Sequence, residues 1–179
     1  MNPESIIHKY YDGQPELEQL LLTHSRLVAE EALSVAERHQ ELNLDHKFLY
    51  EAAMLHDIGI LRCNAPGIHC HGTEHYICHG LEGGKILREE QLPRHARVAE
   101  RHTGTGLTPE TIQRQQLPLP LCDFSPETLE EQVICYADKF FSKTHPSERK
   151  TYERVVQSLE KFGAESVERF QYWHKIFAL

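Results

Sequence analysis

Long apolar runs are absent from this sequence, and none approaches the ~20 residues that a transmembrane helix needs. Runs of basic residues are absent too, and the formal net charge is −8. The backbone of a nucleic acid is bound by clustered Lys and Arg, which this chain does not show. We therefore expect neither a membrane nor a nucleic-acid polymer as partner. A small phosphorylated substrate stays compatible, because two or three local cations can hold it.

Cysteine pairs with C-x-x-C spacing are also missing. The five cysteines are odd in number, and no amino-terminal signal segment is visible. These absences favour free thiols in the reducing cytoplasm. A chain of 179 residues can still bury a sizeable core without disulfides, so we expect one domain over residues 1–179.

Strand patterns are nearly absent, whereas apolar residues recur with the period of 3.6 that is typical of helices. Asp45 is expected to cap one helix and Gly59 to end it, and residues 60–76 are predicted to form a loop. The sequence thus predicts an all-α core over about residues 15–145. The last helices are expected to pack on this core or to serve self-association into a homo-oligomer. Helices are predicted over residues 3–11, 15–40, 45–59, 77–90, 93–102, 125–140, 147–162 and 164–177, with a short one from residue 108.

Six histidines and aspartates stand where these helices turn their apolar faces inward: His24, His56, Asp57, His79, His102 and Asp138. Burying one neutral polar group alone costs ~2–7 kcal/mol. Six such costs would strain a domain whose net stability is ~5–15 kcal/mol. One histidine on an apolar stripe is usually a satisfied core residue, but convergence of all six on cations would offset the cost. Nitrogen and oxygen ligands favour Fe, Mn, Ni, Co or Zn, with Mg also compatible.

The order of these residues resembles the HD-domain superfamily of metal-dependent phosphohydrolases. "LHDIGI" resembles its HDIG variant, and the resemblance continues over about residues 15–145 in "HSRLVAEEAL", "CHGLEGGKIL", "AERHTGTGL" and "EEQVICYADKF". It implies a bundle of about seven to nine helices around a buried metal site. It also implies one ion held by His24, His56, Asp57 and Asp138, and a second held by Asp57, His79 and His102. The GYP signature of cyclic-di-GMP phosphodiesterases is replaced by "TGTGLTPE", so we do not expect hydrolysis of that dinucleotide.

The resemblance implies hydrolysis of a nucleotide or another small phosphate ester or anhydride through a metal-bound hydroxide. Asp57 and Lys139 are the predicted catalytic residues. Three roles stay open for His69, His71 and His75: ordinary loop residues, extra metal ligands or substrate contacts. Our functional interpretation places their loop over the metal site. Predicted substrate contacts are Arg62, His71, His75, Arg101, Lys139 and Lys143.

Two other functions compete with hydrolysis. Some members of the superfamily are mixed-valence di-iron oxygenases with the same six ligands, so the ligands alone cannot discriminate. A binding module with a relic site is disfavoured, because all six ligand positions are filled.

Overall fold

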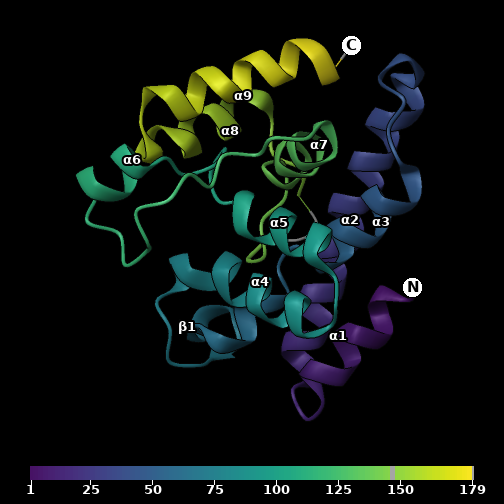
Figure 1. Ribbon diagram of the computed structural model, residues 1–179, viewed down its shortest axis with the longest axis vertical. Helices are drawn as coiled ribbons and strands as arrows, with labels where there is room; N and C mark the ends of the chain where they lie inside the picture. Colours follow the sequence, from purple (N-terminus) through teal and green to yellow (C-terminus); the bar gives the residue numbers. More distant parts are fainter. Residues whose placement is uncertain (146–147, 179) are drawn as a thin grey trace.

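The computed structural model describes residues 1–145 and 148–178, and helices dominate it as predicted (Figure 1). The only described strands, β1 (Asn64–Ala65) and β2 (Cys70–His71), form a small antiparallel hairpin inside the predicted loop. The described α-helices are α1 (Pro3–Tyr11), α2 (Pro15–Arg38), α3 (His46–Leu55), α4 (His79–Glu89), α5 (Pro93–Arg101), α6 (Pro109–Arg114), α7 (Leu129–Asp138), α8 (Tyr152–Leu159) and α9 (Ala164–Phe177). The all-α prediction is therefore confirmed.

Most helices begin at residues whose side chains cap them. The Asp45 carboxylate accepts a hydrogen bond from the Phe48 amide at the start of α3. Thr128 and Glu131 form a reciprocal capping box at the start of α7. Proline occupies the first turn of α1, α2, α5 and α6, where no intrahelical N–H donor is needed. These local signals place the helix starts independently of the core.

Several predicted helix boundaries differ from the structure, and α7 begins at Leu129 rather than at the predicted residue 125. Helix α3 ends at Leu55, and Gly59 lies beyond it in the 3-10 helix η2 (Ile58–Arg62). A Cβ atom at Gly59 would lie 2.2 Å from the Gly83 amide nitrogen and from the His79 carbonyl oxygen. Glycine is thus required there because η2 packs against α4, and the prediction that it ends the helix is wrong. The predicted helix start at residue 147 lies outside the described residues, and α8 begins at Tyr152.

Helix α2 packs on α3 and α7, while α4 packs on α5 and η2. The last helices, α8 and α9, lie together at one end of the molecule beside α7, opposite α1 (Figure 1). Tyr136 of α7 contacts Phe170 and Phe177 of α9, with ring centroids 5.3 and 5.5 Å apart. No helix within the described ranges combines the length and apolar character needed to cross a bilayer. The packing turns the ends of α3, α5 and α7 and the start of α4 toward one interior point.

Candidate metal centre

The six predicted ligands converge in the interior from five segments of the chain. His24 lies within α2, while His56 and Asp57 directly follow α3. Helix α4 begins at His79, His102 directly follows α5, and α7 ends at Asp138. Five of the side chains are buried, and Asp138 keeps 12% of its side chain exposed. At a helix end, backbone carbonyl oxygens can accept hydrogen bonds from the ligand imidazoles without loss of an intrahelical bond.

A first group consists of His24, His56, Asp57 and Asp138. The Nε2 atom of His24 lies 3.1 Å from Asp57 Oδ2 and 3.0 Å from Asp138 Oδ1. The Nε2 atom of His56 lies 3.1 and 3.4 Å from the same two oxygens. Two imidazole nitrogens and two carboxylate oxygens thus surround one small volume.

A second group consists of Asp57, His79 and His102. Here Asp57 presents its other oxygen, Oδ1, which lies 3.4 Å from His79 Nε2 and 3.3 Å from His102 Nε2. The two imidazole Nε2 atoms are 3.0 Å apart. Each oxygen of Asp57 therefore faces a different pair of histidines, which is the arrangement of a bridging carboxylate.

The hydrogen bonds of three imidazoles show that the two groups fit metal ions. The Nδ1 atoms of His56, His79 and His102 donate to the carbonyl oxygens of Ala53, Tyr76 and Ala99 at 2.6–2.7 Å. A neutral imidazole that donates from Nδ1 carries a lone pair on Nε2.

These lone pairs face carboxylate oxygens, and those of His79 and His102 face each other. Acceptors cannot satisfy acceptors, and His56 Nε2 and Asp57 Oδ1 have no hydrogen-bond partner among the described residues. A cation in each group would satisfy all of these atoms. Separations of 3.0–3.4 Å suit neighbouring ligands of an ion bound at ~2.1 Å.

Electrostatics also prepare these side chains for cations. Burial lowers the pKa of His79 to about 3, so this imidazole is neutral at pH 7. Burial opposes ionisation of Asp57, but the Lys143 ammonium and the His56 ring outweigh it and hold the Asp57 pKa well below its usual range. For His56, burial is likewise outweighed by the Asp57 and Asp138 carboxylates, which raise its pKa to about 9. Without an ion its Nε2 therefore carries a proton at pH 7, and a bound cation would take the place of this proton and leave the imidazole neutral. The carboxylates thus attract positive charge to this point.

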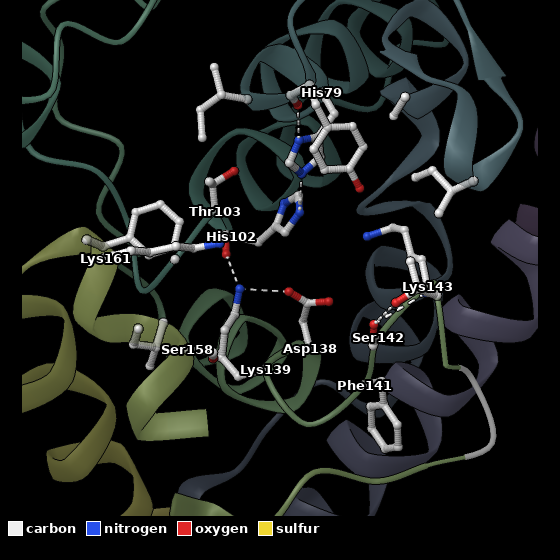
Figure 2. Close-up of a pocket in the computed structure, with 18 of the residues that line it drawn as sticks. His79, His102, Thr103, Asp138, Lys139, Phe141, Ser142, Lys143, Ser158 and Lys161 are labelled. Carbon is white, nitrogen blue, oxygen red and sulfur yellow. Dashed lines mark hydrogen bonds and ion pairs between the residues drawn. The ribbon is translucent and has the colours of Figure 1, made fainter. Parts of the chain in front are cut away.

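A cavity of about 540 Å³ opens onto His79, His102 and Asp138 (Figure 2). Lys143 Nζ lies 2.5 Å from Asp57 Oδ2, and Lys139 Nζ lies 2.7 Å from Asp138 Oδ2. Lys139 also donates to the His102 carbonyl oxygen at 2.7 Å. Both predicted lysines therefore line the cavity beside the ligands.

The other four predicted substrate contacts lie outside the lining of this cavity. Arg101 donates to the Ser125 carbonyl oxygen and forms an ion pair with Glu127. Arg62 and His71 are exposed, and His75 caps a 3-10 turn by accepting from the Ile77 amide. The predicted covering loop does reach the cavity, but through Ala65–Ile68 and Tyr76, and His69 is not in the lining.

Two further lysines, Lys150 and Lys161, line the cavity and were not among the predicted contacts. Both lie beyond the segments whose motifs could be read in the sequence. Lys150 and Lys161 reach the cavity only because residues 148–162 pack against it. No local sequence pattern predicts this packing.

The family model described as "HD domain" matches residues 21–142. The chain belongs to the HD-domain superfamily. This confirms the superfamily that the six residues indicated. The HD domain of the Listeria monocytogenes phosphodiesterase PgpH has a similar fold, with a TM-score of 0.56 at 16% identity over 97% of this chain and 95% of that one. This likeness concerns the fold alone and confirms the HD-domain bundle.

Three other proteins are more similar in sequence to this HD-domain chain than the PgpH domain is. An uncharacterized protein of Methanocaldococcus jannaschii is 34% identical over 79% of this chain and 76% of its own length. Two tRNA (cytidine(56)-2'-O)-methyltransferases, from Picrophilus torridus and Thermoplasma volcanium, are 32% and 31% identical over 70% and 88% of this chain. The matches cover 32% and 42% of those two enzymes, so the chain spans less than half of either.

Proposed function

We propose that this HD-domain chain is a metal-dependent phosphohydrolase that acts on a nucleotide or another small phosphate ester or anhydride. The observation that supports it most is the bridging position of Asp57 beside a lysine-lined cavity. In a chain of net charge −8, four lysines line this cavity: Lys139, Lys143, Lys150 and Lys161. Lysine is a common binder of phosphate, acting as a compact point charge.

In this proposal His24, His56, Asp57 and Asp138 hold one divalent ion, and Asp57, His79 and His102 hold a second. When bound, such ions polarise phosphoryl oxygens and lower the pKa of water toward neutrality. The carbonyl oxygens of Ala53, Tyr76 and Ala99 fix the orientation of three imidazoles, as partners of metal-binding histidines commonly do. These hydrogen bonds therefore orient three of the six proposed ligands toward the ion positions.

In this proposal the lysines stabilise the negative charge on the phosphoryl group. Lys139 and Lys143 are placed to contact the oxygens of a phosphoryl group beside Asp138 and to neutralise the charge that develops on them. A bond forms between the oxygen of water and phosphorus as the bond to the leaving oxygen breaks. The products are free phosphate and an alcohol or a shorter phosphate.

Methyl transfer is not the function we propose, although two relatives are named for it. Those enzymes are matched over 32% and 42% of their lengths, and their names describe whole proteins. The lysine-lined cavity beside two possible ion positions is explained better by a phosphorylated substrate.

A phosphate-release screen tests the proposal. Protein purified without oxygen and supplied with Mn²⁺ or Fe²⁺ is incubated with nucleotides, dinucleoside polyphosphates and sugar phosphates. We expect release from at least one of these compounds under anaerobic conditions, and its loss in the His56→Ala/Asp57→Ala double variant. Oxygen consumption by a di-iron form, without phosphate release from any compound, would favour the oxygenase function instead.

A further inference from the structure

The outer wall of the cavity comes from a part of the chain that the family match does not include. The match ends at residue 142, whereas Lys150, Ser158, Leu159, Lys161 and Phe162 all line the cavity. These residues lie in the described segment 148–162, which contains α8 and ends with the 3-10 helix η5 (Glu160–Phe162). Their contribution is therefore a property of this chain rather than of the matched core.

The four lysines of the cavity differ in their partners. Lys143 pairs with Asp57 and Lys139 with Asp138, so their charges are balanced by the metal-site carboxylates. Within residues 1–145 and 148–178, neither Lys150 nor Lys161 has a carboxylate within ion-pair distance. The cavity lining thus contains two lysines that form no ion pair with a described carboxylate.

The positions of these charges are close enough for them to influence one another. Burial, together with the positive charges of Lys139, Lys161 and Lys143, lowers the pKa of Lys150 despite the opposing effect of Asp138. Lys161 lies over the Phe162 ring, 5.1 Å from its centroid, and extends into the cavity. Figure 2 shows Lys161 and Lys143 reaching toward Asp138 from opposite sides. An anion between them would meet positive charge at both of its ends.

We propose that Lys150 and Lys161 form a second phosphate subsite, and that the substrate carries at least two adjacent phosphoryl groups, as a nucleoside diphosphate does. The terminal phosphoryl group lies at Lys139, Lys143 and the metal site, and the next one lies at Lys150 and Lys161. The assignment of the first position rests on the proposed function. A cavity of about 540 Å³ is in the size range of sites for small ligands of this kind.

Calorimetric binding of inorganic pyrophosphate to metal-free protein tests the second subsite without turnover. The Lys150→Gln/Lys161→Gln variant is compared with Lys47→Gln/Lys175→Gln, which removes the same charge from exposed lysines elsewhere. We expect the first variant to bind pyrophosphate ~10-fold more weakly and the control to change less than ~2-fold. The exposed Lys161 can also be replaced alone, and Lys161→Gln is expected to weaken binding ~3-fold while the protein stays folded.

Steady-state kinetics of the metal-loaded protein provide a second test of the subsite. For wild type we expect a lower KM for ADP than for AMP. In the Lys150→Gln/Lys161→Gln variant, the ratio of the KM for AMP to the KM for ADP should fall toward one. Equal weakening of pyrophosphate binding by both double variants, or by neither, would overturn the subsite. Lysine-dependent pyrophosphate binding without any phosphate release would overturn the proposed hydrolysis and leave the subsite standing. Hydrolysis with equal KM values for ADP and AMP in the wild type would overturn the second subsite and leave the proposed hydrolysis standing.

Discussion

Asp57 determines the geometry of the candidate metal centre more than any other residue, because each of its two oxygens faces a separate pair of imidazoles. It is fully buried, and its nearest described cation is the Lys143 ammonium, 2.5 Å from Oδ2. A carboxylate in such a place is stable only with positive charge around it. Removing the histidines on one side should therefore affect one ion and spare the other.

Replacing His102 by alanine tests this separation. His102 lies in the second group only, so we expect His102→Ala to lose one bound ion per chain and to retain the ion held by His24, His56 and Asp138. Activity should fall by ~100-fold or more, since a two-metal site loses half of its charge. Metal analysis and phosphate release measure both effects. His75→Ala is the matched control, because His75 is exposed and lies outside the cavity lining.

Gly59 shows a different constraint at the residue scale. A methyl group there would meet the Gly83 nitrogen and the His79 carbonyl oxygen at 2.2 Å, and both are backbone atoms that cannot move alone. We expect Gly59→Ala to destabilise the fold by ~3 kcal/mol and to lower the melting temperature by ~6–12 °C. Gly67→Ala serves as the control, because its Cβ would have no neighbour within 4 Å. Equal melting temperatures for the two variants would contradict the close packing of η2 on α4.

At the scale of elements, the ligands are presented by helix ends. Helix α7 ends at Asp138 and begins at the Thr128–Glu131 capping box. The Thr128 hydroxyl accepts from the Glu131 amide at 3.2 Å. The position of Asp138 in the site thus depends on a helix whose start is fixed by local hydrogen bonds.

Thr128→Ala tests the contribution of this cap. We expect a loss of ~1 kcal/mol in the free energy of unfolding, which corresponds to ~2–4 °C in melting temperature. Denaturant unfolding measures it. The exposed Thr73 has no hydrogen bond to its side chain among the described residues, and Thr73→Ala should stay within ~0.5 kcal/mol of wild type. A stability loss no larger than this control would show that the cap is not needed.

The helices could be predicted from the sequence because their signals are local. Asp45 and the prolines in the first turns of α2, α5 and α6 marked helix starts, and the apolar period of 3.6 marked the faces that α2, α3 and α7 bury. The start of α7 was predicted at residue 125, whereas the helix begins at Leu129. The end of α3 could not be predicted, because what requires glycine at residue 59 is α4, twenty residues away in the chain. The hairpin of β1 and β2 was missed because strands of two residues leave no periodic pattern.

At the scale of the whole molecule, the metal ligands at the centre of the site could be predicted from the sequence, whereas the lysines in the outer wall of the cavity could not. The six ligand candidates could be found because polar residues on buried helix faces need a common explanation. Lys150 and Lys161 could not, because an exposed or half-buried lysine in a tail segment resembles any solvated lysine. Only the packing of the described residues 148–162 against the cavity gives these two lysines a shared position.

Metal removal should weaken the whole fold, because buried acceptor atoms of the two groups would lose their cations. An ion present at ~1,000 times its dissociation constant stabilises a folded protein by ~4 kcal/mol. We therefore expect chelation to lower the melting temperature by ~10 °C, and re-addition of Mn²⁺ to restore it. Differential scanning calorimetry with and without EDTA measures the shift. An unchanged melting temperature would mean that the buried acceptors are satisfied without ions.

The central claim is that Asp57 joins two ion sites in one chain. Metal analysis of protein purified without oxygen and saturated with Mn²⁺ or Fe²⁺, after free metal has been removed, tests it most directly. The account predicts two ions per chain, with each carboxylate oxygen of Asp57 serving one. A clean stoichiometry of one ion per chain, unchanged in His79→Ala and His102→Ala, would contradict it.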